Sequence, residues 1–298
     1  MVAIFGHRGA RGLLPENALS GFGLANALEL TGVEFDVGVT RDGVVVVHHD
    51  PRLNQDVARD RQGAYVGADA PLVRDLSFAE LQGYDVGRLR EGSAYAARFA
   101  GQIARDGTRI PSFDAVLEVC EPLDLLVEIK SFPDRPEATL PPAALVAHML
   151  AGLRAAGAVE RSVLYSFDWR VLEEAAKQAP DLRRCCLTEP GSVAAADLWF
   201  GGTSLAAHGN SVPRAVASTG AVVWAPFHEM LDAAQLAEAK ALGLAVIPWT
   251  VNATADFERM LDLGVDGIIT DVPDLALEIL AARGEEPAQP GFVSALRR

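Results

Sequence analysis

The chain has 298 residues, of which 50% are hydrophobic and 22% are charged, so it can bury a full core and is neither disordered nor fibrous. Its formal net charge of -14 disfavours nucleic acid and anionic membranes as partners, because both would be repelled. An anionic substrate would therefore have to meet a local positive patch or a metal ion.

The sequence also lacks a visible targeting or membrane segment. The opening MVAIFGHRGA has no basic region followed by a long apolar run, and no later stretch approaches the ~18 consecutive apolar residues of a membrane span. We therefore expect a cytoplasmic protein without stable membrane association. Cys120, Cys185 and Cys186 lack metal-ligand spacing and are expected to be buried free thiols. The sequence leaves the oligomeric state open.

Short β-rich runs alternate with longer amphipathic stretches along the whole chain, which is typical of βα units around a parallel sheet. The expected strands are residues 2–5, 32–39, 123–129, 162–166, 183–187, 221–225, 245–250 and 267–270. Helical patterns such as 233–242 and 256–263 lie between several of them. Eight units predict an α/β fold, a closed (β/α)₈ TIM barrel, with one catalytic domain over residues 1–283.

The pattern breaks once, after the second strand. A short apolar run at 44–47 looks like a strand extension or hairpin that ends in His48, His49 and Asp50. Residues 51–108 are then richer in Arg, Asp, Gly and Tyr, with a short helix candidate at 77–82, and we interpret them as a rim insertion over the active site. Residues 284–298 are expected to form a loosely held C-terminal tail.

The first strand runs into His7, Arg8 and Gly9, at the C-terminal end of a barrel strand, where catalytic groups usually lie. His7 is therefore a candidate catalytic residue. The alternative is a strand-end histidine that bonds to the backbone.

Glu34 and Asp36 lie two residues apart in GVEFDVGV, so both side chains should point to one face of the strand, opposite Phe35. Two neighbouring buried carboxylates repel each other unless a proton or a cation intervenes, and a hard divalent ion would resolve the repulsion. A solvent-facing acidic pair is the alternative.

The apolar strand at 123–129 carries Glu128, and Lys130 follows on the same face. Glu128 would complete a site for Mg²⁺ or Ca²⁺, and Lys130 could bind a substrate phosphate. A salt bridge between the two residues that seals the barrel is the other reading.

His48 and His49 point to opposite faces, so at most one of them readily enters the pocket of His7. Two inward histidines beside a metal suit general acid-base catalysis, because their ordinary pKa of ~6.5 lets one accept and the other donate a proton. Trp249 ends the strand AVIPWTV, where it could wall a small ligand or pack in the core.

These segments together resemble the glycerophosphodiester phosphodiesterase family. The resemblance lies in HRG at 7–9, PEN at 15–17, EFDV at 34–37, TRDG at 40–43, VVHHD at 46–50, VEIK at 127–130 and WTVN…GVDGIITDVPD at 249–274. Each motif is weak alone, but their order on expected strand ends makes chance agreement improbable. Two departures concern the rim: Ala18 stands where the family often has Thr, and residues 53–57 read LNQDV.

The resemblance implies a (β/α)₈ enzyme that hydrolyses a small glycerophosphodiester to glycerol 3-phosphate and an alcohol. It implies a divalent ion held by Glu34, Asp36 and Glu128, phosphate binding by Arg8 and Lys130, and catalysis by His7 and His49. We assign His7 as base and His49 as acid, an order that the sequence does not fix. Whether water or a glycerol hydroxyl attacks first is equally open.

The sequence is also compatible with two other functions. One is a phospholipase D-like lipid phosphodiesterase, and the other is a non-catalytic barrel that binds phosphodiesters. The insertion is expected to select the alcohol of the substrate, with Tyr65, Tyr84 and Tyr95 as contacts, unless these tyrosines pack in a small core of the insertion itself.

Overall fold

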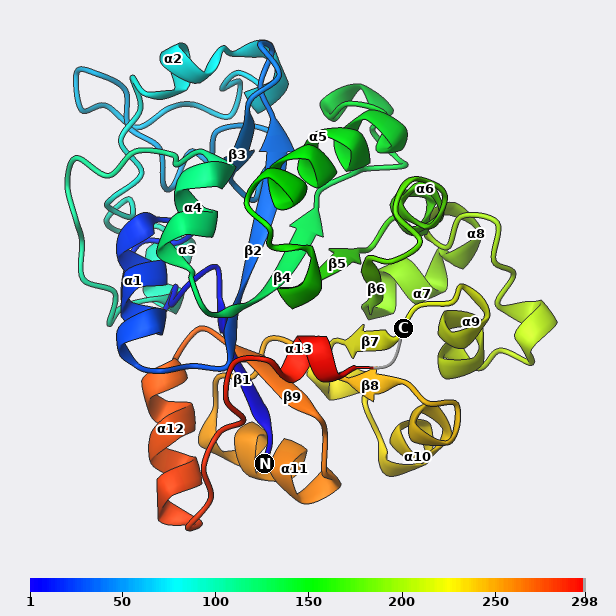
Figure 1. Ribbon diagram of the computed structural model, residues 1–298. Helices are drawn as coiled ribbons and strands as arrows, with labels where there is room; N and C mark the ends of the chain where they lie inside the picture. The colour runs from blue at the N-terminus through cyan, green and yellow to red at the C-terminus, as the bar shows by residue number, and fades with distance from the viewer. Residues whose placement is uncertain (297–298) are drawn as a thin grey trace.

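Eight parallel strands form a ring in the computed structural model, which describes residues 1–296 (Figure 1). They are β1 (Ala3–His7), β2 (Gly32–Val39), β4 (Asp124–Ile129), β5 (Ser162–Ser166), β6 (Arg183–Thr188), β7 (Val223–Pro226), β8 (Ala245–Val246) and β9 (Gly267–Thr270). Backbone hydrogen bonds from Val251 to Ile269 and from Ile269 to Pro248 join the segment after β8 to β9. The predicted α/β TIM barrel is confirmed.

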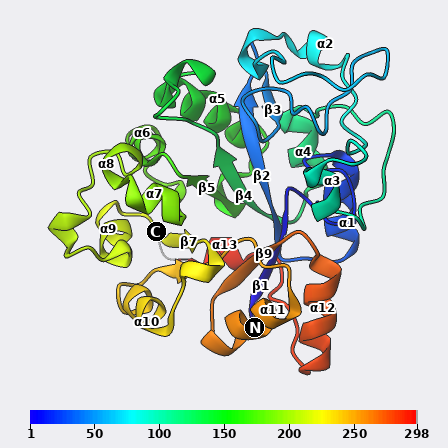
Figure 2. The same ribbon diagram turned by 180° about the vertical axis from the view of Figure 1, so that it is seen from behind.

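The helices surround this ring, as both views show (Figures 1 and 2). The longer helices that cover the strands are α1 (Leu19–Ala27), α5 (Pro142–Ala155), α6 (Trp169–Gln178), α10 (Ala233–Ala241), α11 (Thr254–Leu263) and α12 (Pro273–Ala282). Shorter ones are α4 (Phe113–Val119), α7 (Pro190–Ala194), α8 (Ala196–Trp199) and α9 (Val212–Ser218).

Strand β2 shows how the sequence places the core. Val33, Phe35 and Val37 belong to the apolar layer between the strands and the helices, while Glu34 and Asp36 alternate with them and face the inside of the barrel. The period of two along a strand dictates this division. The predicted orientation of the two acids is therefore confirmed.

Several strand bounds differ from the expected ones, and two of the differences concern the barrel mouth. Strand β1 continues to His7, so this histidine is itself part of the sheet. Strand β8 ends at Val246 rather than at residue 250, because Pro248 has no N–H to donate to a ladder. Trp249 still lies beside Phe227 through an isolated bridge.

The insertion lies on one side of the barrel mouth, next to β2 (Figure 1). It follows β3 (Val45–Val47), which pairs antiparallel with β2, and it contains α2 (Phe78–Leu81) and α3 (Ala94–Arg98). A separate apolar cluster fills it, including Leu53, Leu81 and Ile110. The predicted helix at 77–82 is confirmed, and Ser77 caps it by accepting a hydrogen bond from the backbone N–H of Glu80.

The C-terminal segment was expected to be loosely held, but residues 288–296 contact the barrel. Helix α13 (Phe292–Ala295) lies across the N-terminal end of the barrel, and Val293 is fully buried in the barrel interior. The buried carboxylate of Asp124 accepts hydrogen bonds from the backbone N–H of Gly291 (3.1 Å) and Val293 (2.8 Å). The sequence did not predict these contacts, because Pro287, Pro290 and the two final arginines are typical of a loose tail. The two final residues lie outside the described range.

The helices of residues 1–296 include none with the length and apolar character required to cross a membrane. The three cysteines are free and buried, as expected.

Candidate active site

The strand register brings the predicted polar residues into one layer at the C-terminal end of the barrel. His7 on β1 pairs with Glu34 on β2, and Asp36 on β2 pairs with Glu128 on β4. Parallel strands in a closed barrel fix these neighbours, because their backbones are joined by hydrogen bonds.

His7 is held by a buried carboxylate that the sequence analysis did not single out. Its Nδ1 lies 2.7 Å from Asp271 Oδ1 and 3.1 Å from Arg11 NH2. Because the shorter contact is to a carboxylate, which only accepts, we assign the proton to Nδ1. Nε2 then lacks a proton and lies 3.6 Å from Glu34 Oε2. Arg11 binds both oxygens of Asp271, at 2.8 and 3.1 Å, and Asn252 donates to Oδ2 at 2.7 Å. This arrangement fixes both the ring and the tautomer of His7.

The electrostatics favour a neutral His7. Burial and the nearby Arg11 guanidinium lower its pKa to about 4, against the opposing effect of Asp271. Burial alone would raise the pKa of Asp271, but His7 and Arg11 hold it far below its usual range. At neutral pH the pair is therefore an uncharged imidazole bonded to a carboxylate.

His49, which follows β3, repeats this arrangement. Its Nδ1 lies 2.7 Å from Asp50 Oδ1, and Asn54 donates to Asp50 Oδ2 at 2.7 Å. Burial, Arg8 and Lys130 lower the pKa of His49 to about 4. His48 turns away and contacts the backbone oxygen of Arg52 instead, so the prediction that only one of the two histidines enters the pocket is confirmed.

Glu34, Asp36 and Glu128 form a buried acidic cluster. One carboxylate oxygen from each lies within 4.8 Å of the others, and their exposed fractions are 4%, 1% and 7%. Burial, together with the two neighbouring acids, raises the pKa of Glu34 well above its usual value. Burial and Asp36 raise the pKa of Glu128 to about 7, although Lys130 opposes them. The three groups cannot all be ionised without added positive charge.

The donor set fits a hard divalent cation. Asp36 Oδ1 is buried and accepts no hydrogen bond within residues 1–296, although Lys130 Nζ lies 3.0 Å away. Lys130 also lies 2.6 Å from Glu128 Oε1, so the predicted salt bridge is present within the cluster rather than as an alternative to it. Carboxylate oxygens are the ligands that Mg²⁺ and Ca²⁺ prefer, and three of them lie within 4.8 Å of one another here.

Arg8 links the HRG and PEN segments. Its NH1 donates to Glu16 Oε1 at 2.8 Å, its Nε lies 3.4 Å from Asp36 Oδ2, and its backbone oxygen accepts from the N–H of Asn17 at 2.9 Å. Asn17 also donates from its side chain to Asp36 Oδ2 at 3.0 Å. The two segments thus form one loop system that aims the Arg8 guanidinium at the acidic cluster.

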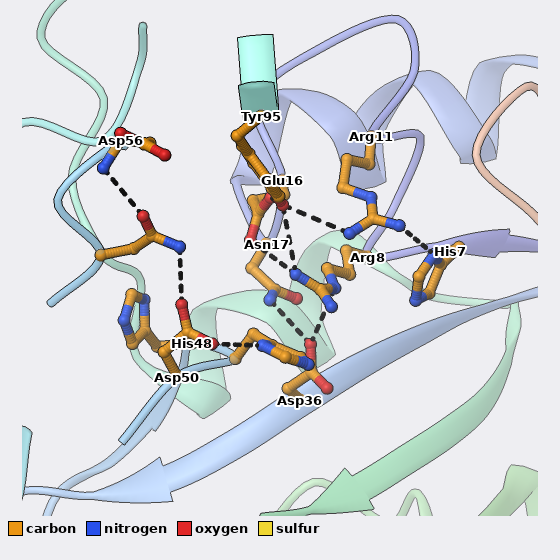
Figure 3. A network of polar contacts seen from close by, with 12 residues as sticks. His7, Arg8, Arg11, Glu16, Asn17, Asp36, His48, Asp50, Asp56 and Tyr95 are labelled. Carbon is orange, nitrogen blue, oxygen red and sulfur yellow. Dashed lines mark hydrogen bonds and ion pairs between the residues drawn. The ribbon is translucent and has the colours of Figure 1, made fainter. Parts of the chain in front are cut away.

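Tyr95 of the insertion closes over this loop system, pointing down from α3 towards Glu16 (Figure 3). Its hydroxyl bonds to Glu16 Oε2 and accepts from Arg11 at 3.2 Å. The other two tyrosines expected at the alcohol lie elsewhere. Tyr65 bonds to the backbone oxygen of Arg88, and Tyr84 packs against the apolar cluster of the insertion.

A cavity of about 560 Å³ opens above these groups. His7, His49, Arg8, Lys130, Glu34 and Glu128 line its charged side. Its other side is aromatic: Trp249 meets Phe167 and Phe227 at ring-centroid distances of 5.3 and 5.6 Å. Trp249 therefore walls the cavity, as expected, and also belongs to the barrel packing.

The sequence did not reveal the residues that orient the histidines. Asp271 and Asn252 lie inside the family-like motif at 249–274, and Arg11 lies just after HRG, but these motifs alone predict no role for them. A usable signal for Asp271 was present, because this acid directly follows an apolar strand, as a catalytic group at a strand end would.

The chain is similar in sequence to a known group of enzymes. The sequence model described as "Glycerophosphoryl diester phosphodiesterase family" matches residues 7–275. A glycerophosphodiester phosphodiesterase from Caldanaerobacter subterraneus is 28% identical over 292 residues, which cover 94% of this chain and 98% of the relative.

Solved structures extend the similarity to the backbone. A protein from Silicibacter pomeroyi that is assigned to the glycerophosphoryl diester phosphodiesterases shares 37% identity and a TM-score of 0.87, over 96% of this chain and 95% of its own. A phosphodiesterase from Oleispira antarctica, solved with its product sn-glycerol-3-phosphate, shares 19% identity and a TM-score of 0.69, over 94% and 96% of the two chains. This second similarity is one of fold.

Proposed function

This chain belongs to the glycerophosphoryl diester phosphodiesterase family, and we propose that it hydrolyses a small glycerophosphodiester to glycerol 3-phosphate and an alcohol with a divalent ion and two histidines. One observation carries the proposal: two histidines with carboxylates on Nδ1 flank a buried acidic cluster at the open end of the barrel. Such a set combines proton transfer with stabilisation of phosphate charge.

Glu34, Asp36 and Glu128 would hold the cation. Bound there, a hard ion such as Mg²⁺ or Ca²⁺ would supply positive charge to a phosphate oxygen as a Lewis acid. Arg8 and Lys130 line the same side of the cavity and would bind the phosphate. Arg8 has a buried Nε without a hydrogen-bond acceptor within residues 1–296, which leaves a donor for a phosphate oxygen.

His7 is suited to act as the base. Its Nε2 is unprotonated and its pKa of about 4 keeps it so at neutral pH, while Asp271 stabilises the positive ring that forms. The attacking hydroxyl, of water or of the substrate's glycerol, gives its proton to Nε2 as its oxygen bonds to phosphorus. If the glycerol hydroxyl attacks first, water then opens the cyclic phosphate in a second step.

His49 would act as the acid. The bond between phosphorus and the alcohol oxygen breaks, the electron pair stays on that oxygen, and His49 supplies the proton that turns the alkoxide into an alcohol. Burial, together with the charges of Arg8 and Lys130, lowers the pKa of His49 in the free protein. A bound phosphate offsets these charges, so substrate binding raises the pKa of His49 towards the range in which it can donate.

A panel of phosphodiesters assayed with and without EDTA tests the proposal. We expect turnover of glycerophosphocholine, glycerophosphoethanolamine and glycerophosphoglycerol, loss of that turnover in EDTA, and recovery with Mg²⁺ or Ca²⁺. Full activity of metal-free protein would refute the metal requirement. Lysophosphatidylcholine and sphingomyelin belong in the same panel, because hydrolysis of these lipids in preference to the three water-soluble esters would favour the phospholipase D-like alternative. The cytoplasmic location stays a prediction.

A further inference from the structure

A second cavity lies beside the catalytic one and shares part of its wall. Its volume is about 580 Å³, and the shared residues are His49, Asp50, Asn54 and Lys130. Its other walls come from the insertion and from the segment that follows β4. We call this second cavity the rim groove. His49 therefore stands at the boundary between two spaces of similar size.

The two histidines differ in which of the two cavities they line. His7, at the end of β1, lines only the catalytic cavity, whereas His49, which follows β3, lines both the catalytic cavity and the rim groove. Substitution at phosphorus requires the attacking and leaving oxygens to lie roughly in line on opposite sides. A leaving oxygen that receives its proton from His49 therefore faces the rim groove, while the attacking oxygen faces His7.

We propose that the rim groove holds the alcohol of the substrate and that the aromatic side of the catalytic cavity holds the glycerol. The assignment rests on the proposed function, with His7 as base and His49 as acid. It divides the substrate at the phosphate: the glycerol contacts barrel residues such as Trp249, whereas the variable alcohol contacts the insertion and the loop after β4.

The charged residues of the rim groove should determine which class of alcohol it binds. Asp50 and Lys130 already have ion-pair partners, because Asp50 contacts His49 and Lys130 contacts Glu128. Arg52 and Arg135 remain among the basic residues of its wall.

Arg52 and Arg135 are both exposed, and Arg135 is the one that stacks on an aromatic residue of the groove wall. Its side chain is 54% exposed and stacks on Phe132 at 4.7 Å, with Nε 3.5 Å from Asp134 Oδ2, whereas NH1 of Arg52 donates to a backbone oxygen at 2.7 Å. A guanidinium carries five N–H donors, so Arg135 keeps donors for a ligand. Glu137 is the opposing acid on the wall. The groove therefore favours an alcohol with a carboxylate or several hydroxyls over one with a quaternary ammonium.

The test compares Arg135→Ala with Arg105→Ala, an exposed arginine of the insertion that lines neither cavity. We measure kcat/KM for glycerophosphoserine, glycerophosphoglycerol and glycerophosphocholine, and inhibition by glycerol 3-phosphate. Arg135→Ala should lower the ratio of the serine ester to the choline ester about 5-fold, as expected for a partly exposed ion pair. It should leave glycerol 3-phosphate inhibition unchanged, and Arg105→Ala should change neither quantity.

A second variant, Trp249→Leu, should give the opposite pattern, with weaker glycerol 3-phosphate inhibition and an unchanged ratio of esters. Unchanged ratios in Arg135→Ala would overturn the proposal, as would a loss of glycerol 3-phosphate inhibition in that variant. If the unmodified protein hydrolyses none of the three esters, the proposed function itself fails, which is a different result from activity without discrimination.

Discussion

The two ends of the barrel are built from the same strands but treat their buried polar groups differently. At the open end, Arg8 Nε and Asp36 Oδ1 are buried without a hydrogen bond within residues 1–296, although ion-pair contacts reach them from Asp36 Oδ2 at 3.4 Å and Lys130 Nζ at 3.0 Å. At the closed end, both oxygens of Asp124 accept backbone N–H groups from the C-terminal segment. A buried polar atom without a partner costs free energy, so the open end retains groups that a ligand would satisfy.

Two residues at the open end also have an unusual backbone conformation. Arg8 has a φ of 49° and Asn17 a φ of 51°, in the left-handed region that residues other than glycine rarely adopt. Such strain persists where surrounding contacts hold it, and here the contacts are those that aim Arg8 at the acidic cluster. Changes at the open end should therefore affect turnover, whereas changes at the closed end should affect the free energy of unfolding.

The largest expected effect is at the two histidines. His7→Ala and His49→Ala should each lower kcat by at least ~10²-fold with little change in the free energy of unfolding, because general acid-base groups typically contribute that much. Steady-state kinetics and urea denaturation measure the two quantities. His208→Ala, a histidine that lines neither cavity, is the control. Near-normal turnover in either variant would remove that histidine from the mechanism.

The next effect is at the closed end and should spare catalysis. Asp124→Ala leaves two backbone donors of the C-terminal segment without their acceptor, which should cost about 2 kcal/mol of unfolding free energy. The kcat of the folded fraction should not change. Asp181→Ala removes an exposed aspartate just before β6 and should leave stability unaffected. If Asp124→Ala lowered kcat at unchanged stability, the separation of the two ends would be wrong.

A smaller effect is expected at Asp271, which acts through His7. In Asp271→Asn the amide can present its NH₂ group to Nδ1 and so favour the wrong tautomer of His7. We expect kcat to fall about 10-fold while KM changes little, since Asp271 has no predicted contact with the phosphate. A rise in KM with an unchanged kcat would instead make Asp271 a binding residue.

The smallest effect tests how far the insertion supports the open end. Tyr95→Phe removes a hydroxyl that bonds to the charged groups of Glu16 and Arg11. It should lower kcat/KM about 3-fold, because Tyr95 acts on the catalytic groups only through these two residues. Tyr65→Phe, which removes a hydroxyl bonded to the backbone of Arg88, is the matched control. Equal effects of both variants would show that Tyr95 only stabilises the insertion.

The sequence predicted those features that follow from local periodicity. Alternation along β2 placed Glu34 and Asp36 inside the barrel, and the strand count predicted the ring that brings Glu128 beside them. These predictions succeeded because a strand has a fixed period and a parallel barrel has fixed neighbours.

Features that depend on contacts between distant segments could not be predicted from the sequence. Asp271 meets His7 across 264 positions, and Asp124 meets Val293 across 169, so no local pattern links either pair. The prediction that all three tyrosines of the insertion contact the alcohol was wrong for the same reason. Composition gave Tyr65 and Tyr95 equal weight, but only the folded insertion decides which hydroxyl reaches the barrel mouth.

The C-terminal plug also sets an order of events during synthesis. Asp124 lies at the start of β4. The backbone N–H groups that donate hydrogen bonds to its carboxylate belong to Gly291 and Val293, which the ribosome adds after every strand of the barrel. Until then the nascent barrel has a carboxylate at its base without these donors, and the pocket that Val293 fills is open. The apolar opening at this end of the barrel therefore closes only when α13 docks.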